Sequence, residues 1–244
     1  MIRRFFIAMQ FLTVFRFWDN LGETDEDLAA SVGLYPVVGL VLGGLLAAGQ
    51  ALFSLFLPPV VTGFLLVFAL ALLTRGLHLD GLADTADGLF SHQDLAVKLV
   101  IMKDSRVGVF GVLALFFILG LKALLLGEAV RDGAYAVVLL FPVWGRLAVS
   151  LTAGLSVYAR SGGGLGRPFV DLAGRREIFL AGGAALLASF LALGLSGLIT
   201  GLAVALGAVI GVEVWRRLLG GVTGDILGAT AELGEALGLL VAAI

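Results

Sequence analysis

Three aspartates in one short segment have the spacing of a cation site. Residues 78–88 read HLDGLADTADG and place carboxylates at Asp80, Asp84 and Asp87. On an α-helix these positions share one face, so the three side chains would point the same way. Carboxylates gathered at a membrane boundary repel one another and lose hydration, which a divalent cation or a cationic substrate offsets. Mg²⁺ is the expected ion, since it binds a few carboxylates together with substrate phosphates.

His78 opens the same segment and has two readings. On an ideal helix its imidazole lies across from the three aspartates. It is therefore either a packing histidine that is held by a hydrogen bond or a catalytic group beside the cation.

A compact basic cluster follows at residues 102–108, with the sequence MKDSRVG. Lys103 and Arg106 flank Asp104, and the Arg side chain offers two parallel donors to a phosphate. We therefore expect an anion site with one further carboxylate. Ser105 is placed to cap the next helix and to add a donor.

The C-terminal apolar run contains carboxylates that need partners. Asp225 and Glu232 are seven residues apart and share a helix face. An unpaired carboxylate inside a membrane span costs at least about 2 to 3 kcal/mol, so a functional role is the default expectation. Glu235 either pairs with Arg146 or packs in its protonated form, and Arg146 itself needs a carboxylate or a substrate phosphate. We assign Asp225 to the metal, and Thr223, Glu232 and Arg146 to substrate binding.

A glycine-rich loop at residues 158–167 reads YARSGGGLGR. Its backbone N–H groups can approach an anion, but its spacing matches neither common phosphate-loop motif. The loop is either a flexible connection or a cover over the substrate, with Tyr158 and Arg160 as candidate contacts. Carboxylates for a metal, basic residues for phosphate and the absence of Cys together favour phosphoryl transfer, in which positioning and charge neutralisation dominate.

Composition places these residues in a membrane protein. Hydrophobic residues make up 60% of the chain and charged residues 14%, against about 25% charged residues in a soluble domain. The dispersed basic residues and the net charge of −2 argue against nucleic-acid binding. We expect an all-α polytopic integral membrane protein, one domain over residues 1–244, with an interfacial amphipathic helix at residues 1–16. About seven crossings are expected, at residues 29–57, 59–77, 107–129, 134–155, 177–195, 198–215 and 225–244.

The basic residues predict the orientation of these crossings. Tight turns at residues 58–59 and 196–197 make the first two crossings, and the fifth and sixth, antiparallel pairs. If the N-terminus is cytoplasmic, Lys122 and Arg131 lie outside or near the outer side, Arg146 lies within a span, and every polar cluster faces the cytoplasm. The cytoplasmic segments then hold 13 of the 16 Lys and Arg residues. They are Arg3, Arg4, Arg16, Arg75, Lys98, Lys103, Arg106, Arg160, Arg167, Arg175, Arg176, Arg216 and Arg217.

Three stretches resemble the signature motifs of the cobalamin synthase (adenosylcobinamide-GDP ribazoletransferase) family. They are GLHLDGLADTADGLF at 76–90, MKDSRVGVFG at 102–111 and GGVTGDILGATAELGE at 220–235. QFLT at 10–13 and LYPVVGLVLG at 34–43 add to the resemblance, which runs in the same order and spacing from about residue 8 to about residue 236. Two departures are visible, because Val14, Phe15 and Arg16 replace an Ile-Pro-like pair and Arg75 stands where the family more often has Gly.

The resemblance implies the last step of nucleotide-loop assembly, at the inner membrane of a bacterial or archaeal cell. A ribose hydroxyl of α-ribazole, or of α-ribazole 5′-phosphate, attacks the cobinamide-linked phosphorus of adenosylcobinamide-GDP, and GMP leaves. Mg²⁺ on the three aspartates would bridge the diphosphate, while Lys103 and Arg106 would neutralise the departing phosphate. Either Asp104 or Asp87 would act as the general base. The partners are these small molecules and membrane lipid, and the oligomeric state, including a homo-oligomer, stays open.

Three other classes share part of the pattern. A CDP-alcohol phosphotransferase of lipid synthesis also has an aspartate cluster at the membrane edge, but with Arg after the Ala and wider spacing, whereas Ala83 here precedes Asp84. A prenyltransferase needs a second Asp-rich motif, which is missing. A cation-coupled transporter could hold Asp225, Glu232 and Arg146, yet transporters place acids near the midplane and show paired repeats.

Overall fold

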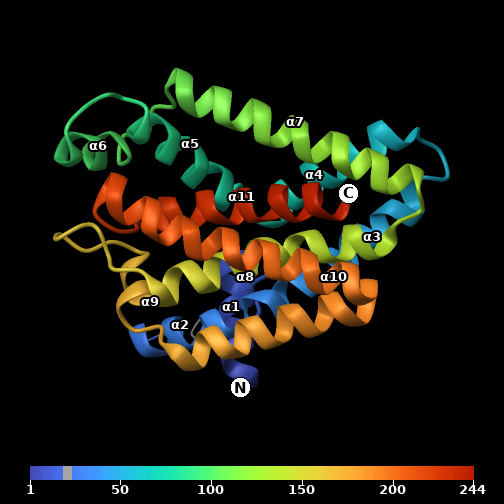
Figure 1. Cartoon of the computed structure of the whole chain (residues 1–244), viewed down its shortest axis with the longest axis horizontal. Coiled ribbons are helices and arrows are strands. Elements are labelled where there is room, and N and C mark those ends of the chain that lie inside the picture. Colours follow the sequence, from blue (N-terminus) through green and yellow to red (C-terminus); the bar gives the residue numbers. More distant parts are fainter. Residues whose placement is uncertain (19–23) are drawn as a thin grey trace.

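The computed structural model describes residues 1–18 and 24–244, and the described chain is helical apart from loops and one isolated β-bridge between Tyr158 and Val222. The predicted all-α class is therefore confirmed. Figure 1 shows the following helices: α1 (Ile2–Leu12), α2 (Asp25–Ser31), the 3₁₀ turn η1 (Val32–Leu34), α3 (Tyr35–Phe53), α4 (Pro59–Leu73), α5 (Leu77–Leu89), α6 (Leu95–Ile101), α7 (Val109–Arg131), α8 (Tyr135–Leu155), α9 (Arg167–Asp171), α10 (Arg175–Leu219) and α11 (Gly224–Ala242).

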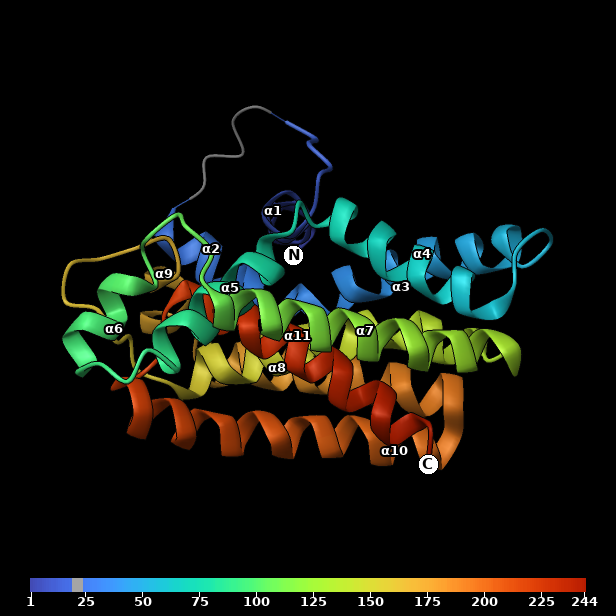
Figure 2. The same cartoon turned by 90° about the horizontal axis from the view of Figure 1, so that it is seen from above.

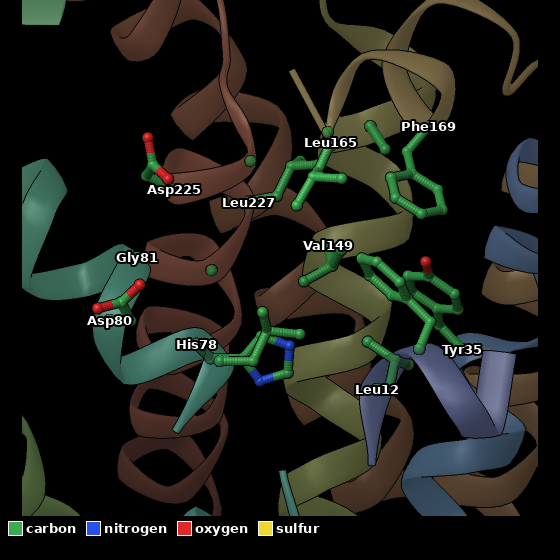
Figure 3. Close-up of a pocket in the computed structure, with 16 residues that line it drawn as sticks. Leu12, Tyr35, His78, Asp80, Gly81, Val149, Leu165, Phe169, Asp225 and Leu227 are labelled. Carbon is green, nitrogen blue, oxygen red and sulfur yellow. The ribbon is translucent and has the colours of Figure 1, made fainter. Parts of the chain in front are cut away.

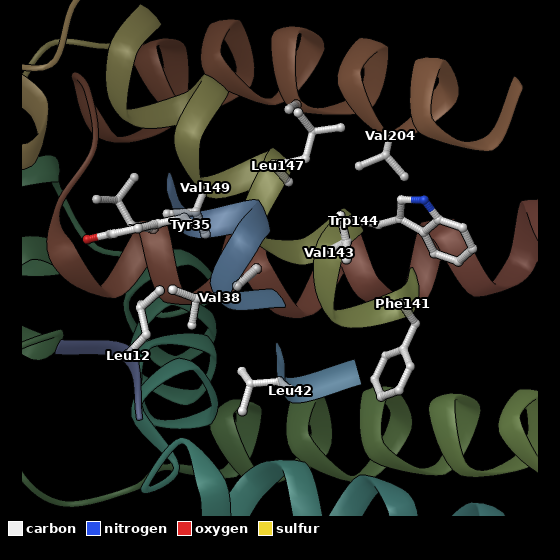
Figure 4. Close-up of a cluster of buried hydrophobic side chains, with 14 of the residues drawn as sticks. Leu12, Tyr35, Val38, Leu42, Phe141, Val143, Trp144, Leu147, Val149 and Val204 are labelled. Carbon is white, nitrogen blue, oxygen red and sulfur yellow. The ribbon is translucent and has the colours of Figure 1, made fainter. Parts of the chain in front are cut away.

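The long helices run along one common axis, and α8 lies in their centre (Figures 1 and 2). Most side chains of α8 are buried, because α3, α10 and α11 all pack against it. Figure 4 shows part of this core, where Val38 and Leu42 of α3 lie beside Val143 and Leu147 of α8. Small residues permit the close packing, since a Cβ atom on Gly39 would lie only 2.8 Å from the Cα atom of Val143.

Four helical segments of the described chain are long and apolar enough to cross a membrane. They are Asp25–Phe53, Val109–Arg131, Tyr135–Leu155 and Arg175–Leu219. The pair α4 and α5 provides a fifth segment if it is counted as one span with a 93° bend. The straight helix α4 ends at Leu73, so it is shorter than the predicted crossing at residues 59–77.

The 45 residues of α10 form two arms that fold back on each other (Figures 1 and 2). The backbone of Gly194 leaves the helical region (φ 63°, ψ −138°), and Gly197 then packs against Ser189 of the preceding arm. A positive φ is readily adopted by glycine, which explains why the chain reverses there. The antiparallel pair predicted around Ser196 is confirmed, with the break two residues earlier.

The bend between α4 and α5 is made by two residues in the left-handed backbone region, Arg75 (φ 55°) and Gly76 (φ 66°). The Arg75 guanidinium donates to the carbonyl oxygens of Gln10 and Phe11, 3.3 and 3.2 Å away, at the end of α1. Arg75 therefore has a strained backbone, and its side chain holds α1 against the bend. The N-terminal helix α1 lies across the long helices and buries only one face, including Ile7, against them (Figure 2).

The acidic segment of α5, the basic cluster, the glycine-rich loop and the start of α11 lie at one end of the bundle, whereas Arg146, Glu232 and Glu235 lie within the helices. Figure 1 shows α6, the beginning of α7, the loop between α8 and α9, and the beginning of α11 together at this end. The turn between α3 and α4, the bend of α10 and the C-terminus lie toward the other end. The long helices thus bring segments that are far apart in sequence to a common site.

Candidate active site

Close packing of α5 against α11 brings two acidic motifs together. A Cβ atom on Gly81 would lie 2.5 Å from the carbonyl oxygen of Asp225, and one on Gly228 would lie 3.3 Å from the Cα atom of His78. Because no side chain fits between the helices, Asp80 and Asp84 of α5 face the first turn of α11.

The carboxylates interact strongly at this junction. The charges of Asp80, Asp225 and Asp87 all act on the partly buried carboxylate of Asp84, and the charge of Arg160 opposes them. Four carboxylates from two helices therefore share one electrostatic environment, and each added negative charge is unfavourable there.

Arg160 supplies a positive charge to this acidic cluster. Its guanidinium donates to Asp225 Oδ2 at 2.8 Å, and the Thr223 hydroxyl donates to the same oxygen at 3.2 Å. The backbone N–H of Ala159 donates to the carbonyl of Val222, and the N–H of Val222 donates to that of Val157, which fastens the glycine-rich loop to the segment before α11. Thr223 also accepts from the backbone N–H of Ile226, so it caps α11 while it orients Asp225.

Asp87 has a second task, because it caps the helix opposite. Its two carboxylate oxygens accept the backbone N–H groups of Gly108 at 2.6 Å and Gly111 at 2.9 Å, at the beginning of α7. The expectation that Ser105 caps this helix is wrong, since the cap residue of α7 is Gly108 and the capping side chain comes from α5. A carboxylate at a helix N-terminus is favoured by the free N–H groups and the helix dipole.

The aspartates are the right donors for Mg²⁺, which prefers carboxylate oxygen ligands. The crowding of Asp80, Asp87 and Asp225 around Asp84 is relieved by a bound cation, so the residues fit such an ion chemically. Within residues 1–18 and 24–244, however, no three His, Cys, Asp or Glu side chains converge closely enough to hold a metal. Asp225 is turned to Arg160 and Asp87 to α7, which accounts for this arrangement.

A cavity of about 220 Å³ opens beside the acidic cluster. Figure 3 shows Asp80 and Asp225 along one edge, Tyr35 and Phe169 on the opposite side, and His78 in the wall between them. The cavity thus combines a charged edge with an apolar interior.

His78 joins this cavity to a buried charge network. Its Nδ1 lies 3.5 Å from a guanidinium nitrogen of Arg146, which can only donate, so Nδ1 accepts and the ring proton sits on Nε2. The side chain is 5% exposed. A histidine whose ring proton is fixed in this way serves better as a hydrogen-bond donor than as a general base, which favours the packing reading of His78.

The network itself pairs two buried cations with two buried acids. Lys122 Nζ lies 2.6 Å from Glu232 Oε2 and 2.5 Å from Glu235 Oε2, while Arg146 pairs with the other oxygen of Glu235. The expected pairing of Glu235 with Arg146 is confirmed. Lys122 is 2% exposed within α7, so it is buried in the bundle, and its position near the outer side of the membrane stays a prediction. The sequence does carry one signal for this network, because one apolar run contains a Lys and another contains two acids.

The substrate roles expected for Glu232 and Arg146 stay predictions. Both side chains are satisfied by protein partners, although the Arg146 Nε–H is buried without one.

The basic cluster before α7 is exposed and pairs internally. Arg106 donates to both carboxylate oxygens of Asp104, and these hydrogen bonds lower the pKa of Asp104 to about 2. Lys103 and Ser105 are exposed on the same loop. Tyr158 is half-buried beside Gly164, and burial raises its pKa. The structure therefore gathers the aspartates and Arg160, whereas Lys103, Asp104 and Arg106 form no ion pair with α5 or α11 among the described residues.

Comparison with known proteins finds similarity along nearly the whole chain. A family model described as CobS, cobalamin-5-phosphate synthase, matches residues 4–243. Three proteins called adenosylcobinamide-GDP ribazoletransferase are similar: those of Acetivibrio thermocellus (39% identical, covering 98% of this chain and 97% of the relative), Syntrophobacter fumaroxidans (42%; 97% and 96%) and Clostridium acetobutylicum (40%; 98% and 94%). No solved structure matches the chain significantly. The chain belongs to the CobS family of cobalamin-5-phosphate synthases.

Proposed function

We propose that the protein is an adenosylcobinamide-GDP ribazoletransferase. A ribose hydroxyl of α-ribazole, or of its 5′-phosphate, would form a new bond to the cobinamide-linked phosphorus. The bond from that phosphorus to the GMP oxygen would break, and adenosylcobalamin or its 5′-phosphate would form. The observation that carries the proposal is the junction of Asp80, Asp84 and Asp225 at one end of the helical bundle, in a chain whose full-length relatives bear this name.

Asp80, Asp84 and Asp225 would hold Mg²⁺, with Asp87 as the fourth candidate. When bound, the ion would neutralise the diphosphate and stabilise the charge that develops during transfer. Asp87 already accepts two backbone N–H groups, which fixes its carboxylate beside the metal site. A cation on Asp225 would free Arg160 to bind a phosphate oxygen, and Tyr158 and Thr223 would stand beside that phosphate.

Lys103 and Arg106 would neutralise the departing GMP from their exposed loop. Of the two proposed general bases, Asp87 is favoured, because a carboxyl group with a pKa of about 2 accepts a proton poorly at neutral pH. Its hydrogen bonds leave lone pairs on both oxygens.

We further propose an inner-membrane protein with seven crossings and a cytoplasmic N-terminus and site. Seven crossings result when the two arms of α10 count separately and α11 is added. The 19 residues of α11 are long enough to cross and include only three charged ones, Asp225, Glu232 and Glu235. Location of the polar clusters at one end of the bundle supports a single cytoplasmic site (Figure 1).

The test is a reconstituted reaction. Purified protein in liposomes would receive Mg²⁺, adenosylcobinamide-GDP and α-ribazole or its phosphate, with GMP release and corrinoid product measured. We expect GMP release that requires both the acceptor and the metal. Transfer from a CDP-alcohol, or cation flux without GMP release, would instead support the lipid-enzyme or transporter reading.

A further inference from the structure

The cavity beside the acidic cluster has an apolar wall that phosphoryl transfer does not require. Six of its apolar residues come from five helices, and they are Phe11, Leu12, Tyr35, Val149, Phe169 and Leu227. Metal and phosphate chemistry would use the opposite edge alone. The apolar wall is therefore suited to an apolar part of a substrate.

The wall is aromatic and built from elements that are distant in sequence. The ring of Phe169 in α9 lies 4.6 Å from that of Phe11 in α1 and 6.2 Å from that of Tyr35 in α3, measured between centroids. Side chains of this kind bind flat rings by stacking and edge contacts. Figure 3 shows Tyr35 and Phe169 side by side, facing the cavity across from Asp80 and Asp225.

The size of the cavity restricts what it can enclose. Pockets that surround a drug-sized ligand measure about 300 to 1,000 Å³, and this one measures about 220 Å³. One fused aromatic ring system therefore fits, whereas a corrin macrocycle does not. His78 adds a single neutral donor to the wall, and the backbones of Gly81 and Gly228 form part of the lining.

We propose that this cavity binds the planar benzimidazole base of the nucleoside acceptor, with its ribose directed at the Asp80 and Asp225 edge. The inference rests on the proposed function and identifies which substrate enters the protein interior. The corrinoid then stays outside the cavity, and only its phosphate reaches the aspartates. Binding of the base in a fixed place supplies the orientation that brings a weak hydroxyl nucleophile to phosphorus.

A cysteine-protection experiment tests the proposal, since the chain contains no Cys. Val149 lines the cavity and is 5% exposed, so Val149→Cys places a thiol of similar size there. Methyl methanethiosulfonate would be applied with and without saturating α-ribazole or its free base. We expect both to slow modification at least tenfold and GMP to have no effect. Ser196→Cys, at the exposed bend of α10, is the control whose labelling should not change.

Protection needs no turnover, so it reports on the cavity even if the transfer assay fails. Equal labelling of Val149→Cys with and without α-ribazole would overturn the proposal and leave lipid or detergent as the occupant. A kinetic variant, Val149→Phe, fills the same space. It should raise the KM for α-ribazole at least tenfold with little change in the KM for adenosylcobinamide-GDP. If that variant is unstable, Leu165→Ala at the 90%-exposed rim should produce a smaller rise.

Discussion

The guanidinium of Arg160 lies 2.8 Å from the carboxylate of Asp225, although 65 residues separate the two in sequence. The side chains are 11% and 24% exposed, so the pair sits at the boundary between the bundle and solvent. Arg160 offsets part of the negative charge that α5 and α11 place together. This relationship defines Arg160 as the basic residue of the site, ahead of Lys103 and Arg106.

Arg160→Ala should therefore lower turnover by about a hundredfold, as expected when one preorganised donor at a reacting phosphate is removed. GMP release in the reconstituted reaction is the measurement. Arg167→Ala is the matched control, because Arg167 lies in the same region and pairs with Asp171 in an exposed contact. Equal losses in the two variants would show that loop charge, and not the contact with Asp225, is responsible.

Asp84→Ala and Asp87→Ala should each reduce activity at least a hundredfold, and chelation of Mg²⁺ should abolish it. The variants should differ in stability. Loss of Asp87 leaves two N–H groups of α7 without acceptors and should cost about 1 kcal/mol, whereas Asp84→Ala relieves repulsion. Thermal unfolding in detergent would compare them, with exposed Asp132→Ala as the control. Full activity in both variants would contradict the metal assignment.

Lys122→Met should destabilise the protein by about 3 to 5 kcal/mol, because it leaves an excess buried negative charge on α11. Adding Glu232→Gln should restore more than half of that loss, since Glu235 and Arg146 then remain as a balanced pair. Unfolding of the two single variants and the double variant measures the coupling. Additive losses would mean that Lys122 does not interact energetically with Glu232.

Arg75 provides a test of backbone strain. Arg75→Ala removes the hydrogen bonds to α1 and keeps a side chain at φ 55°, whereas Arg75→Gly removes the same bonds and relieves the strain. The Gly variant should therefore be more stable than the Ala variant by about 1 kcal/mol. Equal stability of the two would show that the bend carries no strain. The departure from the family pattern at this residue would then have no backbone cause.

The proposed topology predicts which engineered thiols are accessible from outside the cell. An impermeant maleimide should label Ser196→Cys in intact cells and Leu165→Cys only after permeabilisation, because the bend of α10 and the loop between α8 and α9 lie at opposite ends of the bundle (Figure 1). A reporter fused after Ile244 should likewise be external. Labelling of Leu165→Cys in intact cells would reverse the orientation.

Much of this architecture could be predicted from local sequence. Hydrophobic runs longer than a bilayer core require helices, because backbone groups cannot be left unpaired in lipid. The spacing of Asp80, Asp84 and Asp87 predicts one acidic face, and the charge count in the loops predicts one polar end. These are properties of periodicity and composition.

Other features depend on contacts between distant segments. The assignment of Ser105 as the cap of α7 failed because the cap is supplied by Asp87, from another helix. The pairing of Lys122 could not be predicted, because a single sequence does not show that two acids of α11 face it. The aromatic cavity is formed only when α1, α3, α8, α9 and α11 meet. The sequence alone determined the helices, the acidic face and the family. Tertiary structure decided which charges pair and where a ring can bind, because both depend on side chains that packing alone brings within contact distance.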